Sequence, residues 1–253
     1  MEFSRFLACL AADHTRLREA AEGNLAAPVP SCPEWTVEVL VRHVAEVYLH
    51  KTECMRLGHA PEPWPPDPGG EPPLHRLDRA YQELAGEFAA RDPGSAAYTW
   101  YDDDQTVGFW IRRMAQETVI HRVDAELARA AAGIGTVTGI PADLALDGVD
   151  EVLDRFLRYD TEGCADEYTN LPDREEAPVL VSAGELAWQV RATPKGVELA
   201  RVPPGTAAGA TVHGDPESVL LWLWRRVGTE RVETAGDQAL IGRLHTLLGD
   251  ATQ

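Results

Sequence analysis

Apolar positions in the first half of the chain recur every three or four residues, which is the period of an amphipathic helix. The pattern predicts four helices: one over roughly the first twenty residues, one that Thr36 caps and that ends near Leu57, one around positions 74–88, and one over about 107–131. The second and third are joined by APEPWPPDPGGEPP (residues 60–73), whose seven prolines exclude helix and central strand. Four helices with one long crossover predict a four-helix bundle.

The pattern changes in the second half of the chain. Pro141 is suited to open a fifth helix, and four short apolar runs then predict strands: PVLVSA, ELAWQVRA, GVELARV and ATVHGD. Asp215 and Pro216 are suited to cap a further helix, and a final helix carries the apolar residues between 240 and 247. Strands and helices in this order predict an α+β domain with a mostly antiparallel sheet.

We therefore expect an α+β protein of two domains, a four-helix bundle over residues 1–137 and an α+β domain over residues 138–253, joined by the glycine-containing segment AAGIGTVTG. The sequence also predicts how two tryptophans of a late helix pack. Trp222 and Trp224 stand two apart on a predicted helix and face different directions, which predicts that they do not both lie in the core.

Composition narrows the class of protein. With 253 residues, 44% hydrophobic and 25% charged, the chain is typical of a soluble globular protein. No apolar run is long enough to span a bilayer and no signal peptide is evident, so we expect a cytoplasmic protein. The net charge of −18 is spread without a basic stripe, which argues against nucleic acid and membrane surfaces as partners. The cysteines lack CxxC spacing and are expected to be reduced thiols: Cys9, Cys32, Cys54 and Cys164.

Candidate chemistry concentrates in RRMAQETVIHRVDAE, residues 112–126. On the predicted fourth helix, one polar arc separate from the apolar stripe holds four side chains: Arg113, Glu117, His121 and Asp124. Because Glu117 and His121 stand four residues apart, their side chains lie one above the other and can hold the same ion. A metal site would need a third ligand from elsewhere in the chain.

His43 can supply that ligand, because it lies at the edge of the apolar arc of the second helix and should point into the seam between helices. With Glu117 and His121 it makes a set of two imidazoles and one carboxylate. That set suits a catalytic Zn²⁺ site, or Fe²⁺ or Ni²⁺, with positions left open for water or substrate. Asp124, one turn beyond His121, is expected either to accept a ring N–H or to pair with Arg113.

Two alternatives arise from the same spacing. A Glu and a His four residues apart on a helix can equally form a surface salt bridge or remain solvated. His50 and Cys54 are a rival chelating pair on the second helix. His50 lies two turns, about 10 Å, from His43, so these two histidines cannot hold one ion.

The runs SCPEWTVEVLVRHVAEV and FWIRRMAQETVIHRVDAE closely resemble the mycothiol-dependent maleylpyruvate isomerase family. The resemblance implies that the amino-terminal domain is a DinB-like metal-binding bundle, with its metal held by His43, Glu117 and His121. The segments PADLALDGVDE and ATVHGDPESVLLWLWRR resemble the α+β carboxy-terminal domain of that family. Many relatives carry His where this chain has Gln116, and the family includes thiol transferases, so the resemblance does not carry over one substrate.

Together with the resemblance, these observations predict a metal-dependent enzyme that uses a low-molecular-weight thiol, with mycothiol as the first candidate, to isomerise a small electrophilic molecule or to transfer the thiol to it. We expect a monomer or homodimer. We expect Arg113 and Asp124 to assist the chemistry. Arg113 is the first candidate to bind an anionic substrate, and Arg112 and Arg225 are the next candidates. The alternative is a binding or regulatory protein whose bundle holds a metal without turnover.

Overall fold

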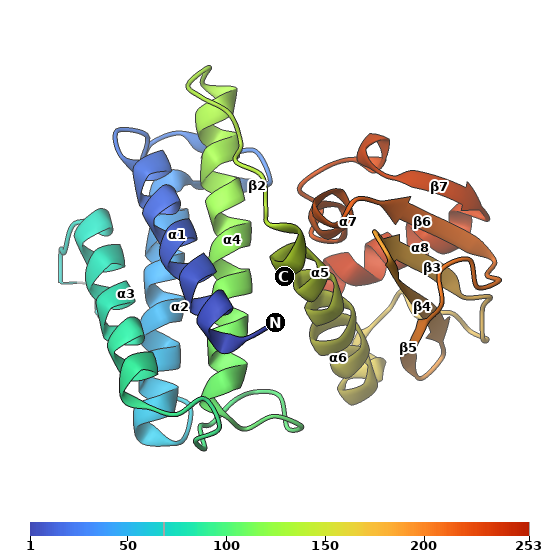
Figure 1. Cartoon of the computed structure of the whole chain (residues 1–253), viewed down its shortest axis with the longest axis horizontal. Coiled ribbons are helices and arrows are strands. Elements are labelled where there is room, and N and C mark those ends of the chain that lie inside the picture. The colour runs from blue at the N-terminus through green and yellow to red at the C-terminus, as the bar shows by residue number, and fades with distance from the viewer. Residues whose placement is uncertain (68, 253) are drawn as a thin grey trace. The chain divides into compact units, whose positions relative to one another are not determined.

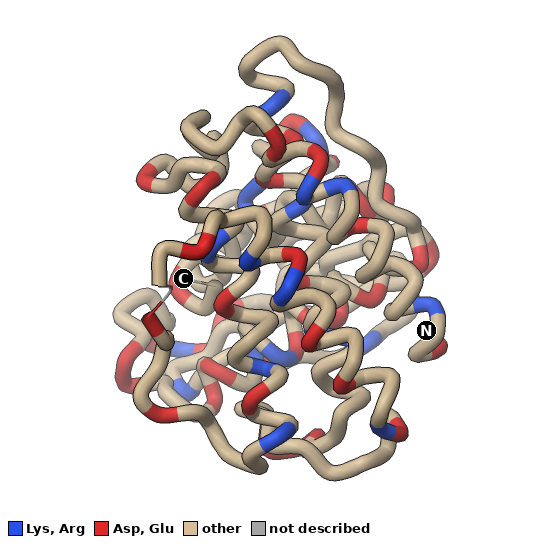
Figure 2. The backbone as a smooth tube through the Cα atoms, turned by 90° about the vertical axis from the view of Figure 1, so that its left-hand side faces the viewer, with Lys and Arg blue, Asp and Glu red and all other residues tan. Residues whose placement is uncertain are grey.

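The computed structural model describes residues 1–67 and 69–252, which form two compact units, Met1–Thr138 and Gly139–Gln253 (Figure 1). Acidic residues are interspersed with basic ones along the described backbone (Figure 2). Among the described residues, no helix is both long and apolar enough to span a membrane.

The first unit contains the four predicted helices: α1 (Phe3–Ala21), α2 (Val37–Leu57), α3 (Pro73–Ala90) and α4 (Val107–Ala131). The Thr36 side chain accepts a hydrogen bond from the backbone N–H of Val39, which confirms the predicted cap of α2. Gly58 ends that helix in the left-handed conformation (φ 75°). The helices of the bundle are therefore where the apolar period placed them.

The relative direction of α2 and α3 follows from the ion pairs between them. Glu46 pairs with Arg76, and Arg56 near the end of α2 pairs with Glu83 and Glu87 near the end of α3, so these two helices run the same way. The proline-rich connection between them therefore returns along the length of the bundle, as the crossover prediction requires (Figure 1). Pro68, one of its seven prolines, lies outside the described residues.

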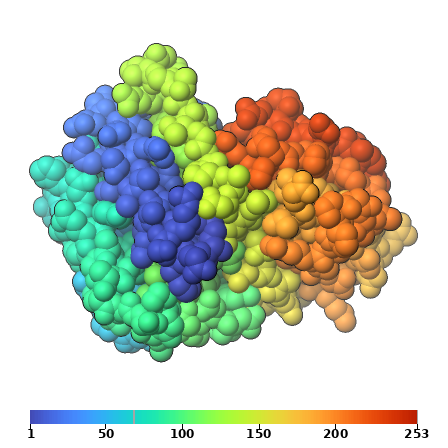
Figure 3. Space-filling view, in the orientation of Figure 1, coloured from blue at the N-terminus to red at the C-terminus, as the bar shows by residue number. Residues whose placement is uncertain are grey.

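α4 is the most buried helix of this unit. It packs along α1 (Figure 3), and its buried residues lie on nearly every side of the helix. Arg122 is fully buried and donates hydrogen bonds to Asp13 of α1 and to Glu126 of α4. Even a charged side chain outside the predicted polar arc of α4 is thus buried, and it is held by carboxylate partners inside the protein.

A short antiparallel hairpin lies between α1 and α2, in a region where the sequence predicts only a break in helix. Its strands are β1 (Pro28–Val29) and β2 (Cys32–Thr36), with Val29 paired to Cys32. The hairpin contacts both α2 and α4. It brings residues just ahead of α2 to the same end of α4 as His121, which matters for the site described below.

The second unit is α+β, as predicted. Its helices are α5 (Ala142–Glu151), the π-helical η1 (Val152–Arg158), α6 (Tyr159–Gly163), the short η2 (Ala165–Glu167), α7 (Pro216–Leu223), the short η3 (Thr229–Arg231) and α8 (Gln238–Ala251). Its strands are β3 (Val179–Ala183), β4 (Leu186–Thr193), β5 (Gly196–Val202), β6 (Ala210–Gly214) and β7 (Glu233–Gly236). The sheet order is β5-β4-β3-β6-β7, and only the β3–β6 pair is parallel. The mostly antiparallel sheet is thus confirmed, although β7 was not predicted.

The prediction that Trp222 and Trp224 do not both lie in the core is wrong, since both are buried. α7 ends at Leu223, and Trp224 follows at its cap. Trp222 stacks on His245 of α8 at a ring separation of 4.8 Å, whereas Trp224 meets Phe156 at 5.5 Å. Both tryptophans are buried because other elements cover the end of this short helix on two sides.

Candidate metal centre

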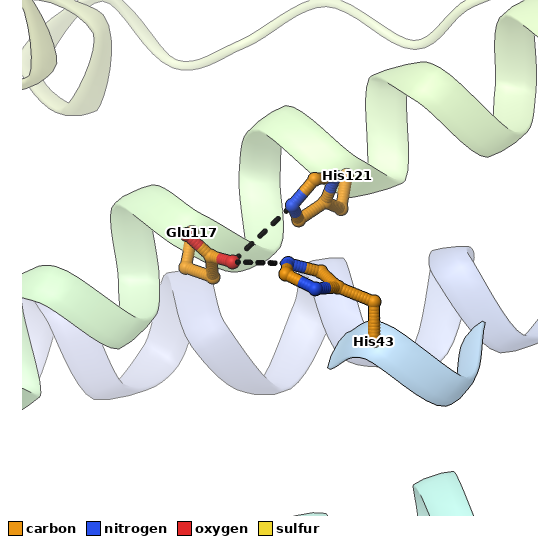
Figure 4. A group of neighbouring side chains, drawn as sticks. All are labelled: His43, Glu117 and His121. Carbon is orange, nitrogen blue, oxygen red and sulfur yellow. Dashed lines mark hydrogen bonds and ion pairs between the residues drawn. The ribbon is translucent and has the colours of Figure 1, made fainter. Parts of the chain in front are cut away.

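Three side chains that the sequence singled out meet in the seam between α2 and α4 (Figure 4). His43 Nε2 lies 3.3 Å from Glu117 Oε1, and His121 Nε2 lies 3.2 Å from the same oxygen. The ligand atoms of all three residues lie within 4.8 Å of one another. The structure thus brings together one residue of α2 and two residues of α4, one turn apart.

The packing of α2 against α4 positions this group. The two helices run in opposite directions, and next to the centre the buried Tyr48 hydroxyl lies 2.6 Å from the Thr118 hydroxyl. Val44 and Leu40 are fully buried beside His43. An apolar stripe on α2 therefore sets the rotation of the helix, and His43 follows at the edge of that stripe.

The other ring nitrogen of His121 is also held. His121 Nδ1 lies 2.9 Å from Asp124 Oδ2, and the Ser31 hydroxyl lies 2.5 Å from Asp124 Oδ1. Of the two partners expected for Asp124, the structure shows the imidazole. A carboxylate on Nδ1 holds a proton there and leaves Nε2, which faces Glu117, as the ring nitrogen that a cation would bind in place of a proton.

Arg113 forms an ion pair with Glu117 through Oε2, the oxygen that does not face the histidines. Burial by itself raises the pKa of the Glu117 carboxyl, but Arg113 and the two imidazoles hold it well below its usual range. Glu117 is therefore ionised and presents Oε1 to the centre. Arg113, the first candidate to bind a substrate anion, thus contacts the carboxylate of the candidate metal centre.

The charge balance of the centre also affects His121. Burial lowers the pKa of its imidazole, but Glu117 and Asp124 outweigh burial and raise the pKa to about 9. Two carboxylates thus favour a positive charge between them. A divalent cation supplies positive charge at the same place, so a cation and the Nε2 proton compete for this position.

The residues present fit a divalent cation. Two atoms that are each bound to one ion at about 2.0–2.2 Å are separated by roughly 3.0–3.5 Å, and the two nitrogen–oxygen separations of 3.2 and 3.3 Å match this range. Nitrogen and carboxylate donors suit Zn²⁺, Fe²⁺ or Ni²⁺. The His43 side chain is 38% exposed, so the centre opens to solvent on the α2 side. Three protein ligands leave room there for a further ligand from solution.

Two residues of this site were missed by sequence reasoning, and both come from the β1–β2 hairpin. Ser31 holds Asp124, and the Trp35 ring lies 4.9 Å from the His43 ring and 6.1 Å from the His121 ring. Trp35 therefore covers both imidazoles on one side. The sequence feature that could have identified both residues is the run SCPEWT, which ends at the helix cap Thr36. It places a polar and an aromatic side chain just before the helix that carries His43.

The rival pair lies apart from this centre. The Cys54 thiol is within 3.5 Å of His50 Nδ1, and neither residue belongs to the group that could hold a metal. Arg112 lies on α4 outside that group. Arg225 belongs to the second unit, where it donates to the Gly249 carbonyl at 3.5 Å. The four cysteines are free thiols.

Comparisons with known proteins agree with the fold. Two solved structures, the mycothiol-dependent maleylpyruvate isomerase and a histidine-to-alanine mutant of it, superpose with TM-scores of 0.60 and 0.62. Each match covers 93% of this chain and 93% of the other, at 12% and 11% identity respectively, and likeness at this identity shows the fold alone. No curated protein is similar enough in sequence to count as a relative.

The sequence itself carries the family assignment. Residues 7–126 match the mycothiol maleylpyruvate isomerase N-terminal domain, and residues 143–243 match the MDMPI C-terminal domain. The two matches together span most of the chain, and they place the candidate ligands and the α+β unit in the domains that the motifs predict. The chain belongs to the mycothiol maleylpyruvate isomerase family.

Proposed function

We propose that this protein is a metal-dependent enzyme that uses mycothiol to isomerise a small electrophilic substrate, or to transfer the thiol to it. The observation that carries the proposal is the convergence of His43, Glu117 and His121 on one solvent-accessible point of the bundle. Family membership supports the thiol. Zn²⁺ is the cation that best suits two imidazoles and one carboxylate, with Fe²⁺ and Ni²⁺ as alternatives.

His43, Glu117 and His121 would hold a divalent cation, which would favour the thiolate form of a bound thiol at neutral pH. Addition of the thiolate to a double bond conjugated to a carbonyl group forms a carbon–sulfur bond and moves the electron pair of the double bond onto the carbonyl oxygen, which leaves a carbon–carbon single bond that is free to rotate. Loss of the thiolate then restores the double bond in the trans geometry, with no net gain or loss of atoms. In a substrate with a leaving group, the thiolate displaces that group and remains attached.

The chain contributes to this chemistry through position and charge. Asp124 holds the His121 ring with Nε2 toward the centre, and Arg113 holds the outer oxygen of Glu117. Trp35 covers the imidazoles and limits the approach of water on that side. Arg113 and Asp124 are thus positioning residues in this proposal, because each acts through a metal ligand.

The proposal extends to the domains and the compartment. Residues 1–137 form the DinB-like metal-binding domain, and residues 138–253 form the family's carboxy-terminal domain. The protein works in the cytoplasm, where its four free cysteines stay reduced.

One experiment separates an enzyme from a metal-binding protein without turnover. The purified protein is loaded with Zn²⁺ and incubated with mycothiol and a panel of electrophiles that includes maleylpyruvate. Mass spectrometry follows thiol adducts, and NMR follows the geometry of the double bond. We expect turnover that requires both the metal and the thiol. Absence of turnover with every electrophile would favour the binding protein.

A further inference from the structure

Lys51 is one of only two lysines in the chain, and it lies half-buried in the seam between α2 and α4. Its Nζ atom lies 3.1 Å from His50 Nδ1 and 5.0 Å from the centre of the Trp110 ring. Burial lowers the pKa of His50 to about 4, so His50 is a neutral acceptor near pH 7. Within residues 1–67 and 69–252, no carboxylate lies at ion-pairing distance from this ammonium.

Other cations of the bundle meet acidic partners. Arg42 binds Glu38, Arg79 binds Glu71, and even the fully buried Arg122 has two carboxylate partners. The chain has 41 acidic residues against 23 basic ones, so carboxylates are abundant. A half-buried ammonium without one loses hydration and gains little in return, unless an anion from solution joins it.

Lys51 lies close to the candidate metal centre. It stands two turns after His43 on α2, about 12 Å along the helix axis, and its flexible side chain reaches across to Trp110, one turn before Arg113. Burial lowers the pKa of Lys51, electrostatic interactions with Cys54 and then Glu117 raise it, and the charge of Arg113 lowers it further. The ammonium is therefore within electrostatic reach of the group that holds the metal ligands in place.

We propose that Lys51 binds a carboxylate of the electrophilic substrate in the α2–α4 seam. This inference rests on the proposed function and adds to it a residue that recognises a carboxylate of the substrate. Arg113 already pairs with Glu117, whereas Lys51 has three N–H donors and, among the residues that the structure describes, one side-chain hydrogen-bond partner, His50. Lys51 and the candidate ligands belong to the same pair of helices, and the proposal places a carboxylate of the substrate at Lys51 with its double bond toward the ligands.

The first test uses the scarcity of lysine. Protein labelled with ¹³C and ¹⁵N only in lysine gives two sets of side-chain signals, one from Lys51 and one from Lys195, which is exposed in the turn between β4 and β5. We expect maleate to shift the Lys51 signals saturably, with and without Zn²⁺, and to leave Lys195 unmoved. Dimethyl maleate, which has the same double bond without the charges, should shift neither. Equal shifts at both lysines, or no shift at Lys51, would overturn the proposal.

The second test uses kinetics. Lys51→Met keeps the apolar stem and removes the charge, Lys51→Arg keeps the charge, and Lys195→Met is the matched control. For an unsaturated acid we expect Lys51→Met to lower kcat/KM by about tenfold or more, as loss of a charged contact does, with partial recovery in Lys51→Arg. The methyl ester of that acid should react equally with Lys51→Met and the unaltered protein. Equal losses for acid and ester would assign Lys51 a structural role and contradict the inference.

The two proposals fail in different ways. A protein that binds maleate at Lys51 but never turns over would refute the enzyme and leave the anion site intact. Turnover that is indifferent to Lys51→Met, with Lys51 signals unmoved by maleate, would refute the anion site and leave the enzyme intact. Metal content, measured in every variant, should stay unchanged because Lys51 does not belong to the ligand group.

Discussion

His121 Nδ1 and Asp124 Oδ2 lie 2.9 Å apart on successive turns of α4, and Asp124 is completely buried. The pair settles which ring nitrogen of His121 faces Glu117, because the carboxylate holds a proton on Nδ1. The hydroxyl of Ser31 binds the other oxygen of Asp124. A residue from the hairpin before α2 is thus linked through a carboxylate to a candidate metal ligand on α4.

Removal of either imidazole should empty the metal centre. We expect His43→Ala and His121→Ala each to lose most bound Zn²⁺ while far-UV circular dichroism stays helical, because one of three ligands matters more to the ion than to the bundle. Elemental analysis after dialysis measures the metal. His75→Ala, an exposed change on α3, is the control. Full metal occupancy in both ligand variants would refute the site.

Loss of the groups that hold His121 should weaken the site without emptying it. Asp124→Asn and Ser31→Ala should each lower Zn²⁺ affinity, by about 10–100-fold for Asp124→Asn and less for Ser31→Ala. Competition with a chromogenic chelator measures the affinity. Ser31→Thr, which keeps a hydroxyl, should recover most of the loss. Unaltered affinity in Asp124→Asn would show that the pair does not orient the ligand.

The protein's own thiols should be dispensable. Cys9 and Cys54 are buried, and the group that could hold a metal contains no cysteine. A variant with Ala at the two buried positions and Ser at Cys32 and Cys164 should keep most of its turnover, whereas omission of mycothiol should abolish it. Activity that survives without added thiol and disappears on replacement of Cys54 would instead identify a protein nucleophile.

His14 should make the bundle sensitive to acid. Its ring is buried, stacks on Tyr81 at 4.0 Å, and has a pKa lowered by burial from 6.5 to about 4, although Asp78 opposes the shift. Between these values the unfolded chain takes up a proton that the folded protein does not, so stability is present above pH 6.5 and falls as the pH drops toward 4. The loss is at most about 3 kcal/mol.

Urea unfolding of the metal-free protein at pH 7 and pH 4.5 measures this loss, with hydrogen exchange of α1 amides as the probe of the bundle. The His14→Gln variant should show a smaller difference between the two pH values, and the exposed His75→Gln should behave like the unaltered protein. An unchanged difference in His14→Gln would show that other groups cause the acid sensitivity.

The segment between the two units should be the first site of proteolysis. Residues 131–136 are exposed, whereas the backbone N–H of Thr138 donates a hydrogen bond of 2.7 Å to the Glu126 carboxylate. Limited digestion with a protease of broad specificity should cut there or in the proline-rich connection, and mass spectrometry should find fragments close to the two compact units. Early cleavage within α4 would contradict this expectation.

Much of the fold could be predicted because local periodicity sets which side chains share a face. The apolar stripe and Thr36 defined α2, and the four-residue spacing of Glu117 and His121 places both side chains on one side of α4. Alternating runs similarly identified β3 to β6. These relations depend only on backbone geometry over a few residues, so they survive into the tertiary structure.

The sequence by itself determined the two halves of the molecule, the candidate ligands and the family to which they point. Only the tertiary structure decided that Ser31 and Trp35 meet the candidate ligands and that Arg113 pairs with Glu117. The tertiary structure placed Lys51 beside Trp110, with no carboxylate of the described residues at ion-pairing distance. It also buried Trp224 against Phe156, contrary to the helical pattern. Most of these contacts join segments that are distant in the sequence. Packing across the whole unit sets how each helix is rotated and where the hairpin lies, and a local sequence pattern does not contain that information.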